Sequence, residues 1–193
     1  MAQTKIIAIT GGIGAGKSIV SAILRVAGYD VYDCDQRAKM LMNTSATIKN
    51  SLTHKFGYDI YTSEGNLNRT RLSDIIFNDR NALHYVNSIV HPAVRDDISH
   101  WAKKHQHGPL FVETAILKEG GLDTIVQEVW NVVAPVEVRI SRVMKRNAIS
   151  REKVLERINN QQPLSPCAEL NVIDLINDST TPLLPQVFNA LSN

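Results

Sequence analysis

The sequence predicts an α/β fold with a five-stranded parallel sheet flanked by helices. Three observations lead to this prediction. A short apolar segment near the N-terminus runs into a glycine-rich turn and then a helical pattern, and about five strand-like segments alternate with helical ones. A long, mostly helical stretch, residues 35–107, separates the second strand from the third. That stretch is too long for a simple crossover, so it predicts a helical insert beside the sheet.

The size and composition of the chain are typical of a compact globular domain. Its 193 residues are 44% apolar and 21% charged, and the formal net charge is +2. Such a small charge, without clustered basic runs, argues against a nucleic-acid partner. No segment approaches the ~18 consecutive apolar residues of a membrane span. We therefore expect a monomer or weak homo-oligomer that acts on small molecules and does not bind nucleic acid or a membrane.

The two cysteines, Cys34 and Cys167, are not accompanied by a secretion signal. The apolar residues 6–9 end at a pair of glycines, which makes them too short for the core of a signal peptide. Reduced thiols are therefore a better interpretation than a disulfide, and the sequence predicts a cytoplasmic protein.

The first three elements predict a strand–loop–helix–strand unit. Residues 5–10 form an isoleucine-rich strand that Gly11 ends, and residues 16–27 have apolar side chains at helical spacing. Gly28 suits the end of that helix, and residues 29–32 give the second strand. A unit of this kind is typical of parallel sheets.

The insert is predicted to be mainly helical. Its helical segments are residues 35–56, 69–77 and 81–105, and residues 57–67 form a turn region rich in Gly, Asp, Ser and Asn. Pro92 interrupts the last segment, so we expect a kink or a new start there.

The remaining elements complete the sheet and its helices. Strands are predicted at residues 110–113, 128–134 and 171–176, and helices at residues 136–147, 150–161 and 182–191.

The glycine-rich turn matches the eight-position phosphate-loop pattern, Gly11-Gly12-Ile13-Gly14-Ala15-Gly16-Lys17-Ser18. It also has the required context, because it follows a strand and opens a helix. Glycines let successive N–H groups point at phosphate oxygens, and the helix N-terminus adds its positive dipole end. The lysine can reach the outer phosphates and Ser18 can bind Mg²⁺, while Ile19 stands where a threonine is frequent. We expect residues 12–19 to bind nucleotide.

The loop alone does not say how the nucleotide is used. No Asp-x-x-Gly or Asn-Lys-x-Asp of a GTPase switch is present, and the strand at residues 110–113 ends in Glu113 rather than the aspartate of a large ATPase. A small-molecule kinase is favoured by analogy with other short phosphate-loop chains. A kinase for a nucleoside or nucleotide and a non-catalytic ATP-binding regulator remain alternatives.

Several further motifs, in order along nearly the whole chain, resemble the dephospho-coenzyme A kinase family. They are Asp33-Cys34-Asp35 with Arg37, Gly65-x-Leu67-x-Arg69-x-x-Leu72 with Phe77, Asn87 with His91-Pro92, Glu113 to Glu119, and Arg142, Arg146, Arg157 and Gln161. Two features depart from the family pattern: Lys118 stands where an apolar residue is common, and the late aspartate, Asp174, is displaced.

The resemblance implies an enzyme that transfers the γ-phosphoryl group of Mg·ATP to the ribose 3′-hydroxyl of dephospho-coenzyme A. Such a transfer needs positioning and charge stabilisation more than covalent chemistry. Within one domain we expect a core of residues 1–34, 108–141 and 167–193, an acceptor-binding insert of residues 35–107, and a lid of residues 142–166. The lid would close over ATP and exclude water.

Asp35 is the predicted catalytic base, because it follows the second strand and the carboxyl ends of parallel strands face the ligand. The alternative is a helix N-cap. Asp33 could contact the substrate or a metal-bound water, or simply cap the strand end. Arg37 and His91 are candidate substrate contacts, with a solvated arginine and a structural histidine as the alternatives.

Three side chains of the core and lid complete the predicted site. Glu113 could hold a water on Mg²⁺, pair with Lys17, or be structural. Arg142 and Arg146 lie one helical turn apart, and their guanidinium groups could contact the nucleotide and the transferring phosphoryl group. The alternative for both arginines is a solvated basic helix face.

Overall fold

The computed structural model describes residues 5–105, 108–161 and 170–192. Cys167, the end of the predicted lid and the last residues of the predicted insert lie outside them. The chain divides into two compact units, Met1–Asp33 with Lys104–Asn193, and Cys34–Lys103. None of the helices in the described ranges combines the length and apolarity that a membrane span requires.

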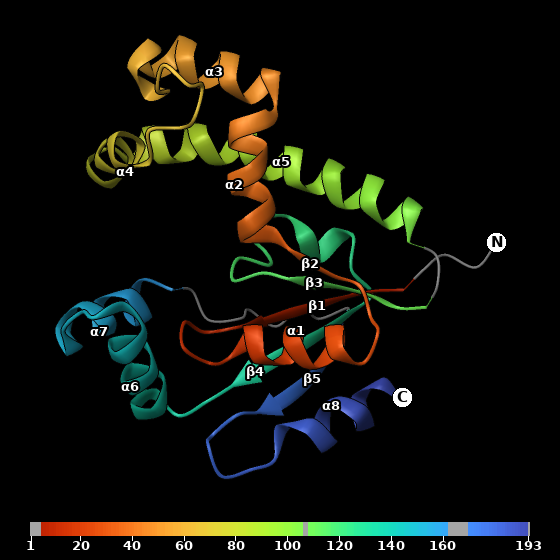
Figure 1. The fold of residues 1–193 in the computed structure, drawn as a ribbon. Coiled ribbons are helices and arrows are strands. Elements are labelled where there is room, and N and C mark those ends of the chain that lie inside the picture. The colour runs from red at the N-terminus through yellow and green to blue at the C-terminus, as the bar shows by residue number, and fades with distance from the viewer. Residues whose placement is uncertain (1–4, 106–107, 162–169, 193) are drawn as a thin grey trace. The chain divides into compact units, whose positions relative to one another are not determined.

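The first unit is built on a five-stranded sheet in the order β2-β3-β1-β4-β5 (Figure 1). Its strands are β1 (Ile6–Gly11), β2 (Val31–Asp33), β3 (Leu110–Glu113), β4 (Glu128–Val133) and β5 (Asn171–Ile176). Every neighbouring pair is parallel, which confirms the predicted fold class. The carboxyl ends of all five strands therefore meet at one edge of the sheet.

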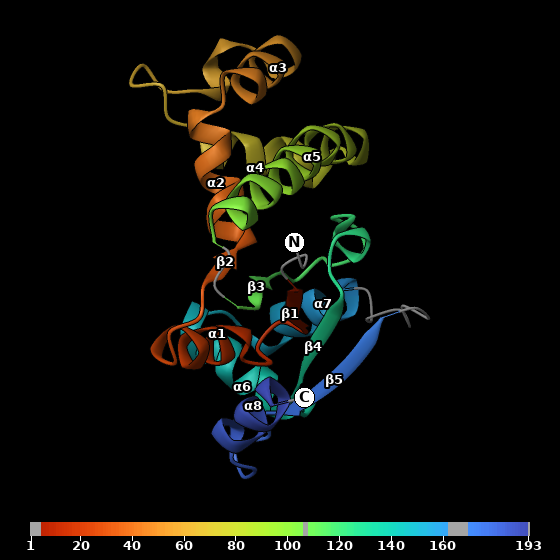
Figure 2. The same cartoon turned by 90° about the vertical axis from the view of Figure 1, so that its right-hand side faces the viewer.

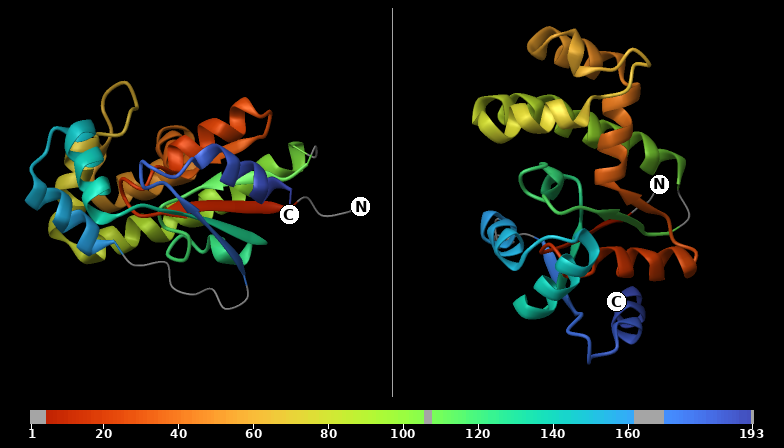
Figure 3. Two further views of the ribbon diagram at one scale, coloured as in Figure 1. Left: turned by 90° about the horizontal axis from the view of Figure 1, so that it is seen from below. Right: turned by 60° about the vertical axis from the view of Figure 1, so that its left-hand side comes forward.

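In the described part of the first unit, four helices and one 3₁₀ turn accompany these strands, and the last helix follows β5. They are α1 (Lys17–Val26), η2 (Leu122–Thr124), α6 (Val136–Asn147), α7 (Arg151–Asn160) and α8 (Leu183–Leu191). Helices α1 and α8 pack side by side on one face of the sheet (Figure 2). Helices α6 and α7 pack against each other as a hairpin beyond the end of β4 (Figure 3).

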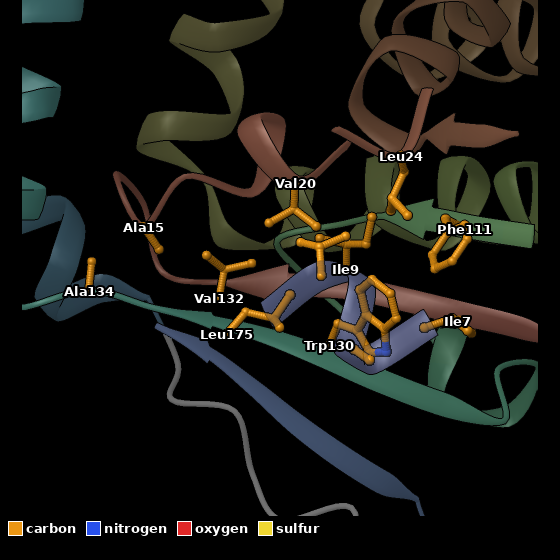
Figure 4. Packing of buried hydrophobic residues seen from close by; sticks show 12 residues of the cluster. Ile7, Ile9, Ala15, Val20, Leu24, Phe111, Trp130, Val132, Ala134 and Leu175 are labelled. Atoms are coloured by element: carbon orange, nitrogen blue, oxygen red, sulfur yellow. The ribbon is translucent and has the colours of Figure 1, made fainter. Parts of the chain in front are cut away.

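The main core lies between the sheet and the pair α1 and α8. Ile7 and Ile9 point into it because alternate residues of a strand face the same side. Figure 4 shows Val20 and Leu24 of α1 packing over this face of the sheet. The other members include Phe111, Trp130, Val132, Leu175, Val187 and Ala190. Thr10, which is one residue out of phase with Ile9, faces the opposite side.

Helix α1 ends as its sequence predicts. Gly28 has a φ of +88°, in the left-handed region. Its N–H donates to Arg25 O at 3.1 Å, and the Tyr29 N–H donates to Leu24 O at 2.9 Å. These two bonds form a Schellman motif, which satisfies the last carbonyl groups of the helix and turns the chain into β2.

The second unit is helical apart from one isolated antiparallel β-bridge between Tyr61 and Leu67. Its elements are α2 (Cys34–Thr44), α3 (Ala46–Phe56), η1 (Tyr58–Ile60), α4 (Arg69–Asn78) and α5 (Arg80–Lys104). Along α5, buried apolar side chains recur every four residues from Ala82 to Ile98. The guanidinium of Arg37 on α2 holds both carboxylate oxygens of Asp97 on α5, each at 2.8 Å.

The structure refines two local predictions in the second unit. The mostly helical residues 35–56 form two helices, because Ser45 stops α2 and caps α3 by accepting the N–H of Ile48 at 3.4 Å. Residues 80–104 form one helix with Pro92 inside it, so the helix does not restart there, and the kink stays a prediction. The buried stripe on both sides of Pro92 explains why helical packing outweighs the loss of one hydrogen bond.

Candidate active site

The loop that joins β1 to α1 curls over the carboxyl edge of the sheet. Gly14 and Gly16 have φ values of +79° and +104°, which glycine adopts far more readily than other residues. Helix α1 starts directly afterwards at Lys17, so its free N–H groups face the space enclosed by the loop. The local geometry is that of an anion cradle.

The side chains at the start of α1 are arranged around this cradle. The Lys17 Nζ donates to the carbonyl oxygen of Gly11 at 2.9 Å, which places its ammonium group across the mouth of the loop. Ser18 is exposed in the first turn of the helix. Ile19 is 48% exposed, and its N–H donates to Gly16 O at 3.0 Å.

The outer side of the loop is held by hydrogen bonds from three other elements. The Arg139 Nε of α6 donates to Ile13 O at 2.9 Å, and the Asn177 Nδ2 beyond β5 donates to Ala15 O at 2.7 Å. The side-chain oxygen of Gln161, which follows α7, accepts the Ile13 N–H at 2.7 Å. Residues at both ends of the hairpin of α6 and α7 thus hold the loop.

Close contacts with these side chains explain two of the loop glycines. A Cβ on Gly12 would collide with the guanidinium of Arg139, and a Cβ on Gly16 would collide with the amide of Asn177. At Gly16 the positive φ and the buried amide both favour glycine, whereas at Gly12 a side chain would displace the Arg139 guanidinium from the loop.

The side chain of Ile13 anchors the loop to the hairpin of α6 and α7. It packs against a small apolar cluster in which Ile140 and Val143 of α6 meet Val154 of α7. All three are at most 1% exposed. Because Ile13 forms part of this cluster, the hairpin and the tip of the loop share one core.

The two predicted lid arginines lie in different environments. Arg142 donates to Asn177 Oδ1 at 3.2 Å, to Ser179 Oγ at 2.9 Å and more weakly to Ala15 O at 3.3 Å. Arg146 is exposed in the last turn of α6, where its Nε donates to Asn147 Oδ1 at 3.0 Å. Both lie inside α6, so the predicted lid boundary at residue 142 falls in the middle of a helix.

Two carboxylates stand side by side at the ends of neighbouring strands. Asp33 and Glu113 are register partners of β2 and β3. Side chains of register partners point to the same face of a sheet. The Ser21 hydroxyl of α1 donates to the Glu113 carboxylate at 2.7 Å, so this face is the one that carries α1. The pair therefore belongs to the same side of the sheet as the start of α1.

The other predicted substrate residues belong to the second unit. Asp35 is exposed in the first turn of α2, which begins one residue after β2 ends. It is the second residue of the helix, so its N-cap interpretation is wrong. Arg37 is paired with Asp97 rather than fully solvated. His91 is half-buried in α5 directly before Pro92.

A cavity of about 420 Å³ adjoins the loop at the carboxyl edge of the sheet. It is bounded by Thr10, by the end of β4, by the loop after β3 and by the hairpin of α6 and α7. Its lining residues include Gly12, Leu117, Lys118, Glu119, Asn131, Arg139, Ile158 and Gln161. Partial burial lowers the pKa of Arg139 from its ordinary value.

The protein itself offers few ligands for a metal ion. Among the described residues, no group of three or more His, Cys, Asp or Glu side chains could hold one. The exposed Ser18 hydroxyl beside the cradle is nevertheless a suitable single ligand. This fits Mg²⁺, which keeps several waters and is usually held by one or two protein groups plus substrate phosphates.

Comparison with known sequences identifies the family. The profile of the dephospho-CoA kinase family matches residues 5–182. The chain belongs to the dephospho-CoA kinase family. The dephospho-CoA kinase of Porphyromonas gingivalis is 37% identical over 94% of this chain and 90% of its own length. That of Bacteroides fragilis is 34% identical over 96% and 91%. The family resemblance predicted from the motifs is confirmed.

Solved structures agree with the fold of this dephospho-CoA kinase family member. A crystal structure from Thermus thermophilus superposes with a TM-score of 0.81 at 32% identity, covering 99% of this chain and 96% of that one. A dephospho-CoA kinase from Campylobacter jejuni gives 0.69 at 20% identity, over 97% and 95%. The latter supports the fold alone.

For two residues of this family member, the sequence did not predict that their side chains hydrogen-bond the loop backbone. Arg139 precedes Arg142 by three residues, so helical spacing could have placed it on the same face of α6. Asn177 follows the last strand, but no local pattern indicates that its amide reaches Ala15, 162 positions earlier.

Proposed function

We propose that this protein transfers the γ-phosphoryl group of ATP to the ribose 3′-hydroxyl of dephospho-coenzyme A, giving coenzyme A and ADP. The observation that carries the proposal is the loop of residues 11–18 between β1 and α1, within a chain that matches the dephospho-CoA kinase family from residue 5 to residue 182. The cavity beside the loop has a volume suited to a small-molecule substrate.

The loop and the start of α1 hold the triphosphate in this proposal. Residues 12–19 enclose the β-phosphate, with the N–H groups of Gly14 and Gly16 directed at it, and Lys17 neutralises charge on the outer phosphates. The Ser18 hydroxyl would hold Mg²⁺, which would supply positive charge to offset the negative charge of the phosphates. Glu113, beside α1, would contribute a carboxylate near that ion.

Asp35 acts as the general base in this proposal. An ionised carboxylate can accept the proton of the attacking 3′-hydroxyl, provided that it lies within hydrogen-bonding distance of it. Asp35 is exposed, and only one residue separates it from the end of β2. Asp33 supports the same region from the end of the strand, next to Glu113.

The acceptor is held by the second unit and the lid in this proposal. Arg37 and His91 contact dephospho-coenzyme A, and the bond between Arg37 and Asp97 keeps the guanidinium in a fixed orientation. Arg146 extends from α6 toward the transferring phosphoryl group when the lid closes, whereas Arg142 supports the nucleotide site. The protein works in the cytoplasm as a monomer or weak homo-oligomer, without nucleic-acid partners.

A product assay tests the proposal directly. The purified protein is incubated with Mg·ATP, with and without dephospho-coenzyme A, and the acceptor is analysed by mass spectrometry. We expect acceptor-dependent ADP release and a product heavier by one phosphoryl group. Fragmentation should place that group on the ribose 3′ position. ADP release that ignores the acceptor, or phosphorylation of nucleoside monophosphates instead, would rule the proposal out.

A further inference from the structure

The backbone of the phosphate loop is braced by side chains of other elements, two of which, Arg139 and Gln161, also line the adjoining cavity. Two carbonyl oxygens of the loop, those of Ile13 and Ala15, receive short hydrogen bonds from Arg139 and Asn177 respectively. The N–H of Ile13 is held separately by Gln161 at 2.7 Å. These are side-chain bonds to a backbone that could otherwise rotate its peptide planes.

The direction of each carbonyl sets the direction of the next N–H. In a planar trans peptide the C=O and the following N–H point in opposite directions. With the Ile13 and Ala15 carbonyls held outward, the N–H groups of Gly14 and Gly16 must point to the inner side of the loop. Neither N–H has an acceptor among the described residues, so both are available to a phosphate oxygen.

The donors are themselves held in place. The Asn177 N–H donates to Val133 O at 2.8 Å, and its side-chain oxygen accepts a bond from Arg142 at 3.2 Å. Asp178 orders the turn that follows: N–H groups of Thr181 and Thr180 bond to its carboxylate and hold the pKa of Asp178 well below its ordinary value. Only 8% of Asn177 is exposed, so its amide cannot easily change partner.

We propose that Arg139, Asn177 and Gln161 are positioning residues for nucleotide binding. They fix the Ile13 and Ala15 peptides from outside, so that the N–H groups of Gly14 and Gly16 face the phosphates before the nucleotide arrives. A cradle that is already formed loses less free energy to ordering when the ligand binds. The proposal rests on the phosphate-binding step of the proposed function and not on the identity of the acceptor.

Two substitutions of Arg139 separate positioning from direct contact with the ligand. Arg139→Gln places an amide nitrogen where Nε stood, so the bond to Ile13 O can persist although the charge is lost. Arg139→Met has a similar length but no donor. Lys145→Met, on the exposed side of α6, is the matched control for loss of a positive charge. Dissociation constants for ADP and for pyrophosphate are measured by titration calorimetry.

We expect Arg139→Met to bind both probes about three- to tenfold more weakly, which is the effect of one lost hydrogen bond. Arg139→Gln should stay within about twofold of the natural protein, and Lys145→Met should bind like it. Equal losses in the Gln and Met variants would overturn the proposal, because a direct charge contact with the ligand would then explain the effect. Unchanged affinity in the Met variant would overturn it too.

Asn177→Asp provides an independent test on another element. The change preserves shape but replaces the donor with a carboxylate oxygen that faces the Ala15 carbonyl, so we expect about tenfold weaker ADP binding. The thermal midpoint is measured alongside. A lower midpoint with unchanged ADP affinity would mean that the contact only stabilises the fold. Because neither test uses an acceptor, failure of dephospho-coenzyme A phosphorylation would leave these results interpretable.

Discussion

The two edges of the sheet both carry carboxylates, but the surroundings of these groups differ. At the amino edge, the Glu128 carboxylate is 6% exposed and accepts bonds from Trp130 at 2.8 Å, Lys5 at 3.0 Å and Asn171 at 3.0 Å. At the carboxyl edge, Asp33 and Glu113 stand beside the open end of α1 and the phosphate loop. The first cluster is satisfied within the protein, whereas the second adjoins N–H groups that no described residue occupies.

The difference shows how polar groups are divided between stability and ligand binding. A buried carboxylate with three donors gives a fixed structure but has little capacity left for a substrate. The phosphate loop differs, because its Ile13 and Ala15 carbonyl groups are hydrogen-bonded while the N–H groups of Gly14 and Gly16 have no acceptor among the described residues. The loop can therefore still bind an anion. Substitutions at the carboxyl edge should therefore change turnover and spare stability, and the reverse should hold at the amino edge.

The largest effect is expected for Lys17→Ala. Removing the ammonium group from the mouth of the loop should lower turnover by about 10²–10³-fold, as loss of one electrostatic group does in other enzymes. The thermal midpoint should stay within about 2 °C, because the side chain does not support the core. Steady-state kinetics and thermal unfolding measure the two quantities. Lys145→Ala is the matched control, and retention of more than a tenth of the activity would contradict the assigned role.

Asp35→Asn should lower turnover by about 10²–10³-fold through loss of the proton acceptor. The amide has the shape of the carboxylate, so the Michaelis constants for both substrates should change little. Asp96→Asn, an exposed position on α5, is the control for loss of a negative charge from the second unit. Near-normal turnover in the Asp35 variant would remove this residue as the base.

Glu128→Gln tests the amino edge. The change turns one of the acceptor oxygens into a donor and removes the charge opposite Lys5, so it should lower the free energy of unfolding by about 2 kcal/mol, or roughly 4–8 °C in midpoint. ADP affinity should not change. Glu156→Gln, exposed on α7, is the control. If the variant bound ADP more weakly but kept its stability, the assignment of stability to the amino edge and of ligand binding to the carboxyl edge would be wrong.

The pH dependence of stability sharpens the same comparison. Burial opposes ionisation of Glu128, but hydrogen bonds from Trp130, Lys5 and Asn171 outweigh it and lower the pKa of this carboxyl group. The contribution of ionised Glu128 to the free energy of unfolding is therefore complete above about pH 4.3, the pKa of a glutamate in the unfolded chain. It is lost as the pH falls through the lower pKa of the folded state. The difference in unfolding free energy between the natural protein and Glu128→Gln should be constant from pH 6 to 8 and shrink below about pH 4. Urea titrations that show a growing difference in acid would contradict this.

The smallest effect is expected for Ser21→Ala. Loss of the hydroxyl removes the hydrogen bond that orients the Glu113 carboxylate. Turnover should therefore fall about threefold, which is the effect of one lost hydrogen bond. Unchanged turnover in steady-state kinetics would mean that the orientation of Glu113 does not matter to the reaction.

Local signals were sufficient for most elements and for the loop. The bounds of β3, β5 and α6 were predicted to the residue, although the pattern of β5 is weak. The phosphate loop could be predicted because its chemistry depends on eight consecutive residues. The split between α2 and α3 was missed, since one serine cap had to outweigh a continuous helical pattern.

The sequence by itself determined the parallel α/β fold, the phosphate loop and the family, because each depends on residues close together in the chain or on their order. The tertiary structure decided what surrounds the loop. It placed Arg139, Gln161 and Asn177 on Ile13 and Ala15 across more than 120 positions, and it directed Arg142 toward Asn177 and the loop backbone. Such contacts depend on how distant elements pack, and no periodicity or spacing within one segment encodes them.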